Sequence, residues 1–111
     1  MEIIEAAGRY TPAMEGEPNH WIAHVVTDDL SMGTYSIPKG GLDDQEAHNE
    51  DELYIVHTGT ATMVTDSGSV EVKPGMVIFI PAGEAHVFTE VQEDFSVIGI
   101  FAPPLGKGKA R

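Results

Sequence analysis

Residues 75–86 of the chain read GMVIFIPAGEAH, and this stretch carries the strongest structural signal in the sequence. The apolar run 76–80 has the length of a buried strand and is bounded by Gly75 on one side and by Pro81 and Gly83 on the other. The proline and glycine turn brings His86 to the beginning of the next run of strand-forming residues. The stretch therefore predicts two short strands joined by a tight turn, with a histidine at the start of the second strand.

Short runs of the same kind recur along the whole chain, whereas helical periodicity is hard to find. They are rich in β-branched and aromatic residues, and glycine, proline, aspartate and serine separate them. This pattern is typical of a sandwich or barrel, so we expect an all-β fold. The expected strands are 3–6, 21–27, 31–37, 53–58, 60–65, 69–73, 77–80, 86–90 and 96–101.

The length of 111 residues suits one domain with one core. We expect a single barrel over residues 1–102 and a flexible tail over 103–111, because the tail is rich in proline, glycine and basic residues without periodicity. The first residues lack the basic and apolar regions of a signal peptide, and no apolar stretch approaches the length of a membrane span. We therefore expect a cytoplasmic protein.

The charge balance narrows the range of partners. Eighteen acidic residues face six basic ones, which gives a formal net charge of −12. Binding to nucleic acid or to an anionic membrane needs Lys and Arg to displace counterions, so neither partner is expected. Cysteine is absent, so any metal ion must be held by histidine and carboxylate side chains.

A second segment, residues 40–59, reads GGLDDQEAHNEDELYIVHTG and combines histidine with carboxylates. Glu46, His48 and Glu52 are separated by even numbers of residues, so on an extended strand their side chains share one face. A straight strand would hold His48 and Glu52 about 13 Å apart, which is the limit for two ligands of one ion. The backbone at 49–51 should therefore bulge or bend if both residues bind.

The two segments together resemble the paired motifs of the cupin superfamily. Nearly every motif element has a counterpart at the family spacing, and the chain is similar to small single-domain cupins. The resemblance implies a cupin-type antiparallel β-barrel or jelly-roll sandwich. Two positions differ from the family pattern, because Glu46 replaces the first histidine of the first motif and Glu90 replaces the asparagine of the second. The matching residues are Gly40, His48, Glu52 and Gly59 in the first segment and Gly75, Pro81, Gly83 and His86 in the second.

The resemblance also implies a site for one divalent metal ion, held by His48, Glu52 and His86, with Glu46 in the fourth position. Two alternatives stay open at this position: Gln45 turns inward instead if the segment bulges, and Glu46 acts as a general base beside the metal. Two histidines and one carboxylate suit Fe(II), Mn(II), Ni(II) or Zn(II). Glu90 lies about 13 Å along the strand from His86, so we do not expect it to share a metal with that residue.

Apolar side chains with inward parity are first of all core residues, and some of them are expected to line a ligand pocket beside the metal. The pocket candidates are Tyr54, Ile78 and Phe88, and Trp21 is a further aromatic residue of interest. The acidic residues between Asp43 and Glu52 are expected to form a solvated lip. Such a lip would repel anions, which favours a neutral or cationic small-molecule ligand.

The resemblance implies an enzyme of small-molecule metabolism, in which chemistry with Fe(II) and O₂ is the first expectation and isomerase or lyase chemistry the second. The alternative is a non-catalytic binding or sensor module, and a third possibility is a metal-free barrel that serves only as a dimerisation unit. An open position on the metal would distinguish a catalytic site from a closed structural one. A homodimer is also expected, because small cupins commonly pair through an outer sheet and both faces of the strand at 53–56 are apolar.

Overall fold

The computed structural model describes residues 1–109, which form eight β-strands and no helix. No helix in this part of the chain is therefore long and apolar enough to cross a membrane. The prediction of an all-β fold is confirmed. The strands are β1 (His20–Val26), β2 (Ser31–Ile37), β3 (Asp51–Thr58), β4 (Ala61–Thr65), β5 (Gly68–Val72), β6 (Val77–Ile80), β7 (His86–Thr89) and β8 (Phe95–Ala102).

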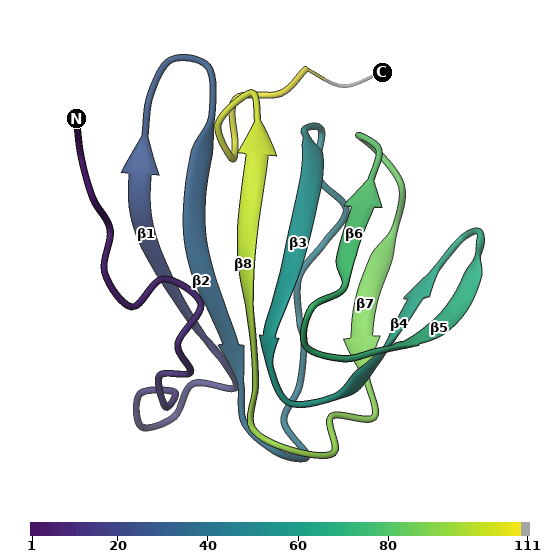
Figure 1. Ribbon diagram of the computed structural model, residues 1–111. Coiled ribbons are helices and arrows are strands. Elements are labelled where there is room, and N and C mark those ends of the chain that lie inside the picture. Colours follow the sequence, from purple (N-terminus) through teal and green to yellow (C-terminus); the bar gives the residue numbers. More distant parts are fainter. Residues whose placement is uncertain (110–111) are drawn as a thin grey trace.

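The strands form two antiparallel sheets. The larger sheet has the order β1-β2-β8-β3-β6, and the smaller one has the order β5-β4-β7 (Figure 1). Strands β6 and β7 follow each other in sequence but lie in different sheets, so the turn at residues 81–85 carries the chain from one sheet to the other. This is the turn predicted from the proline and glycine pattern, and it brings the start of β7 close to the start of β3.

Alternation along each strand places the core between the sheets. On β3 the side chains of Glu52, Tyr54 and Val56 are buried and the intervening ones are more exposed. Met63 of β4 and Phe88 of β7 are buried against them from the smaller sheet. Because side chains alternate between faces with a period of two, Glu52 points to the same side as this apolar core.

The strand expected at residues 3–6 is wrong. Ala6 has a φ of 63° and Gly8 a φ of 85°, and Arg9 N donates to the carbonyl of Ala6 across a turn. These positive φ values are incompatible with an extended strand. The segment instead crosses the outer face of the larger sheet, where Gly8 N donates to Thr34 Oγ1 and the Gly8 carbonyl accepts from Ser96 Oγ.

The chain after β8 folds back toward the site. Leu105 N donates to Ser31 Oγ over 2.9 Å, and Gly108 N donates to Glu50 Oε2 over 2.7 Å. The flexibility expected for residues 103–111 stays a prediction, and residues 110 and 111 lie outside the described residues.

Candidate metal site

Three side chains from two distant segments meet at one end of the core. His48 precedes β3, Glu52 is the first buried residue of β3, and His86 begins β7. One ligand atom from each residue lies within 4.8 Å of the others. The backbone bends at residues 49 and 50, which shortens the distance that a straight strand would impose between His48 and Glu52.

Backbone contacts of the turn at residues 81–83 hold the two segments together. Gly83 N donates to the carbonyl of His48 over 2.6 Å. Ala82 N donates to Asp51 Oδ1 over 2.9 Å. Gly83 has a φ of 86°, a conformation that residues with a Cβ rarely adopt, so the glycine of this motif serves the turn itself. The turn thus connects the loop that carries His48 to the strand start that carries His86.

Glu52 is the chemically unusual member of the group. Its side chain is only 1% exposed, and neither carboxylate oxygen has a hydrogen-bond partner among the described residues. His86 Nε2 lies 3.0 Å from Glu52 Oε1, but without the alignment of a hydrogen bond. A buried carboxylate without donors is costly, and proteins compensate such a charge by pairing it or by coordinating a metal.

A backbone carbonyl orients the imidazole of His86. Its Nδ1 lies 2.9 Å from the carbonyl oxygen of Glu84, so Nδ1 carries the proton and Nε2 is directed at Glu52. A backbone carbonyl in this role fixes the tautomer that a metal-binding histidine needs. Burial lowers the pKa of His86, but interactions with the Glu52 carboxylate, the Glu84 carbonyl and Asp43 outweigh burial and raise it above its ordinary 6.5.

Gln45 and Tyr54 complete the polar surroundings. Tyr54 OH donates to Gln45 Oε1 over 2.7 Å and lies 3.2 Å from His86 Nε2. Gln45 Oε1 also lies 3.2 Å from His48 Nε2. Burial, with the charge of Glu52 next in importance, raises the pKa of Tyr54 well above its ordinary 10.0. Tyr54 therefore keeps its proton at neutral pH.

Asp43 determines how the Gln45 amide is oriented. This buried carboxylate accepts from Gln45 Nε2 over 2.6 Å, from Gln45 N over 3.2 Å, from Tyr35 OH over 2.7 Å and from Phe88 N over 2.8 Å. Because the amide nitrogen of Gln45 faces Asp43, its amide oxygen faces the histidines. Burial and the adjacent Asp43 also raise the pKa of Tyr35, so this hydroxyl remains a donor.

A cavity of about 160 Å³ opens beside His48 and Glu52. Its apolar walls come from Trp21, Tyr35, Tyr54 and Phe101, and from Leu105 of the segment after β8. Trp21 and Phe101 meet edge to face, with ring centroids 5.9 Å apart. His48 and Glu52 line the same space, so a molecule in the cavity would contact both aromatic rings and the candidate metal ligands.

The other predicted site residues lie elsewhere. Glu46 is exposed and lines a second hollow, to which His86 and Gln45 also contribute, and it does not belong to the group of ligand atoms formed by His48, Glu52 and His86. Ile78 lines another hollow near the β4–β5 turn. Phe88 is buried in the core, with edge-to-face contacts to two neighbouring rings. Of the three pocket candidates, only Tyr54 lines the cavity beside the candidate ligands.

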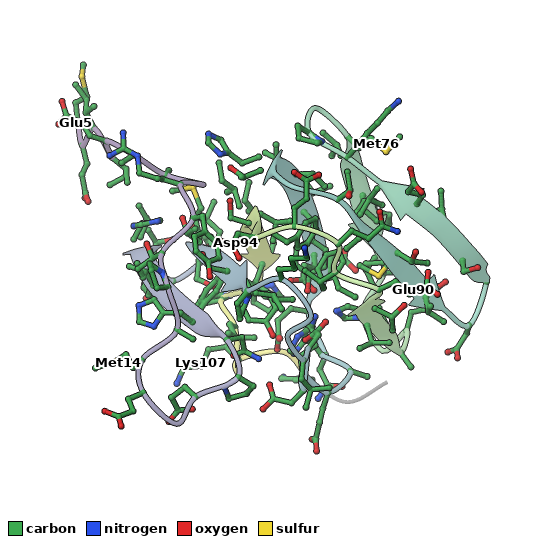
Figure 2. The ribbon with its side chains drawn as sticks, turned by 90° about the horizontal axis from the view of Figure 1, so that it is seen from below. Glu5, Met14, Met76, Glu90, Asp94 and Lys107 are labelled. Atoms are coloured by element: carbon green, nitrogen blue, oxygen red, sulfur yellow. The ribbon has the colours of Figure 1, made fainter. Side chains whose placement is uncertain are left out.

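Glu90 also lies apart from the site. It is exposed, adopts a φ of 50° just after β7 and accepts from Thr62 Oγ1 over 3.1 Å. Figure 2 shows Glu90 on the side of the smaller sheet, whereas Lys107 lies toward the opposite end of the molecule.

Several contributors to the site were not predicted from the sequence. The acidic lip is only partly solvated: Asp44 and Glu46 are exposed, whereas Asp43 and Glu50 are buried and accept hydrogen bonds. No local pattern distinguishes these acids from their exposed neighbours. Phe101 could have been predicted, because, together with the other inward-facing residues, it lies at every second position of its strand.

The comparisons with known proteins agree with this architecture. Residues 33–101 match the family described as the cupin domain, which is more than half of the chain. An uncharacterized protein of Streptomyces coelicolor is 37% identical over 76 residues, covering 68% of this chain and 72% of that protein. The chain therefore belongs to the cupin-domain family, and the cupin resemblance is confirmed.

Solved structures show the same fold at low sequence identity. A protein of Klebsiella pneumoniae with a double-stranded beta-helix domain superposes with a TM-score of 0.75 at 18% identity, covering 90% of this chain and 87% of that one. KdgF of a Halomonas species superposes with a TM-score of 0.71 at 18% identity, covering 81% and 84%. At this level of identity the likeness extends to the fold alone.

Proposed function

We propose that the protein is a metal-dependent enzyme of small-molecule metabolism, in which His48, Glu52 and His86 hold one divalent ion. The observation that carries the proposal is the Glu52 carboxylate, which is 1% exposed, lacks a hydrogen-bond donor among the described residues and lies within 4.8 Å of a nitrogen from each histidine. A cation between these three groups would supply the compensation that Glu52 does not receive from neutral histidines.

The donor set bears on which metal would bind. Two imidazole nitrogens and one carboxylate form the combination known from non-heme Fe(II) sites, and the amide oxygen of Gln45 is a neutral donor 3.2 Å from His48 Nε2. Gln45 is our preferred fourth group, because Glu46 is exposed. A neutral fourth donor leaves one negative charge in the ligand set, and Mn(II), Ni(II) and Zn(II) remain compatible with it.

A bound ion would act as a Lewis acid toward a substrate oxygen or would react with dioxygen. The remaining functions belong to the protein. Trp21 and Phe101 form apolar walls of the cavity, the Glu84 carbonyl holds the proton on His86 Nδ1, and Gln45 accepts a hydrogen bond from Tyr54 OH. The first candidate reaction is oxidation of a small organic substrate by Fe(II) and O₂.

One observation favours a second candidate, proton-transfer chemistry of the isomerase or lyase type. Tyr54 OH lies at the wall of the cavity, 3.2 Å from His86 Nε2. A positioned phenol of this kind can donate a proton to a substrate. Oxygen consumption with substrate would support the first candidate, and turnover without oxygen would support the second.

Metal analysis tests the proposal directly. Untagged protein should carry or accept close to one divalent ion per chain, measured by elemental analysis and by anaerobic calorimetric titration after chelation. His86→Ala and Glu52→Gln should each lose this ion. His57→Ala is the matched control, because His57 is exposed and outside the site. Protein that is metal-free and cannot be reloaded would refute the site, and loaded protein without any turnover would favour a binding module.

We also propose a homodimer formed through the outer face of the larger sheet. Leu53 pairs with Phe79, and Ile55 pairs with Val77, and all four side chains point away from the core. Val77 and Phe79 of β6 are 61% and 58% exposed and Leu53 of the adjacent β3 is 37% exposed, so these large apolar residues form an uncovered patch across two strands. Phe79→Asp should convert the dimer to a monomer in light scattering, whereas a monomeric parent would refute the proposal. A cytoplasmic location remains a prediction.

A further inference from the structure

The aromatic wall of the cavity depends on two glycines that face each other on adjacent strands. Gly33 of β2 pairs with Gly99 of β8, so the inner face of the sheet carries no side chain at either position. The six-membered ring of Trp21 fills this space, and a Cβ at Gly33 would lie 2.5 Å from two of its ring atoms. Trp21 is therefore held in the wall by the shape of the sheet beneath it.

The neighbouring ring closes a corner of the cavity. The planes of Trp21 and Phe101 are 78° apart, and Tyr35 and Tyr54 line the same space. Aromatic rings present negative potential on their faces, so several rings around one cavity favour a cation. An alkylated cation is favoured most, because removing its hydration shell costs little free energy.

The charged residues around the cavity also favour a cationic ligand. Asp44 and Glu52 are the charged residues that line it, and no lysine or arginine does so. Asp43 is buried behind Gln45 and adds a third carboxylate. A divalent ion would offset two of these three negative charges. An anionic ligand would therefore find no lysine or arginine in the described wall, and His48 would be its only ionisable basic neighbour there.

We propose that this cavity binds a small organic cation of the alkylated ammonium class, with an oxygen substituent directed toward His48 and Glu52. The inference deepens the proposed function and rests on it, because the oxygen is the atom presented to the metal. The ammonium group lies among Trp21, Phe101 and the tyrosines, and Asp44 at the rim supplies the opposite charge. Asn19 Nδ2 holds Asp44 Oδ1 at 2.8 Å, which keeps this carboxylate at the mouth of the cavity.

A charge series at constant shape tests the inference. Choline, 3,3-dimethylbutan-1-ol and 3,3-dimethylbutanoate differ in charge but have nearly the same branched end. Binding is measured by calorimetry and by the fluorescence of Trp21, the one tryptophan of the sequence. Choline should bind at least about tenfold more tightly than the neutral alcohol, since a desolvated cation over aromatic faces gains energy of this order. The carboxylate, compared in chelated protein where no bound ion can attract its charged end, should bind most weakly.

Two variants test whether the residues of the cavity wall cause the preference for choline over the neutral alcohol. Asp44→Asn should lower the affinity for choline and leave that for the alcohol nearly unchanged, and exposure of Asp44 makes this variant safe for folding. Trp21→Leu should lower the ratio of the two affinities further. If Trp21→Leu does not fold, the charge series and Asp44→Asn still decide the question. Equal or tighter binding of the alcohol or carboxylate, or no binding of choline at millimolar concentration, would overturn the inference.

The same preparations separate this inference from the proposed function. Metal content is titrated on each of them before any ligand is added. Bound metal without a preference for the cation refutes the inference and leaves the metal site standing. A preference for choline in protein that cannot be loaded with metal supports the cation-binding wall and refutes the metal site.

Discussion

Replacing Asp43 by Asn tests how the core supports the candidate metal site. The two side chains have nearly the same shape, but an amide group can accept through only one of the two positions that the carboxylate uses. Oδ1 accepts from Tyr35 OH and Gln45 N, and Oδ2 accepts from Gln45 Nε2 and Phe88 N. If Oδ2 becomes NH₂, Gln45 Nε2 and Phe88 N lose their acceptor and face another donor; if Oδ1 does, Gln45 N loses its acceptor and the Tyr35 hydroxyl must turn to accept.

The magnitude follows from these contacts. A hydrogen bond to a charged group contributes about 1.5–3 kcal/mol, and part of the loss of two is recovered because the buried charge disappears as well. We therefore expect Asp43→Asn to lower the free energy of unfolding by about 3 kcal/mol, a large share of the roughly 5–15 kcal/mol typical of a domain. The released amide of Gln45 should also weaken metal binding, because its oxygen is no longer directed at the histidines.

Urea unfolding followed by Trp21 fluorescence measures the first effect, and calorimetric metal titration measures the second. Asp44→Asn is the matched control, since it makes the same chemical change on the adjacent exposed residue and should keep both values close to those of the parent. If Asp43→Asn and Asp44→Asn are equally stable, the four hydrogen bonds of Asp43 do not stabilise the core. If stability falls but metal affinity does not, Asp43 does not act through Gln45.

Two other predictions concern pH and the first motif. Since the pKa of His86 in the folded metal-free protein is raised above 6.5, its pairing with Glu52 should stabilise the fold below pH 6.5 and should fade as the pH rises through the raised value. The difference in urea midpoint between the parent and His86→Ala, measured with chelator, should therefore shrink with rising pH, and a constant or growing difference would contradict this. Gly59→Ala should lower the free energy of unfolding by more than about 1 kcal/mol, because Gly59 has a φ of 78° and its Cβ would collide with the carbonyl of Asp94. Gly40→Ala is its control, with a φ of 69° but nothing near the added Cβ, and an equal loss in both variants would assign the whole effect to backbone strain.

The sequence predicted the fold well because strands and turns leave local patterns. Alternation on β3 and the proline and glycine turn after β6 are both visible in short windows. The expected strand at residues 3–6 was wrong for a related reason, since β-branched residues there say nothing about the positive φ of Ala6. Backbone conformation at a single position depends on contacts with β2 and β8, which lie far away in the sequence.

The residues of the candidate site that follow a motif spacing could be predicted from the sequence. The residues whose role depends on being buried could not. Spacing singled out His48, Glu52 and His86, which the fold brings together. Parity arguments could not decide between Gln45 and Glu46, because that segment is irregular rather than extended. Asp43 was assigned to solvent because most acids in a polar run are exposed, and its burial depends on the amide of Phe88, 45 residues later.

The turn at residues 81–83 has a consequence for the thermodynamics of any bound ion. Its hydrogen bonds to His48 and Asp51 belong to the protein and involve no metal, so folding itself gathers the donor atoms. Such preorganisation transfers the entropic cost of chelation from the binding step to the folding step. In a zinc finger, by contrast, the ion provides much of the folding free energy. Stripping the ion from this protein should leave a folded chain that can be reloaded repeatedly.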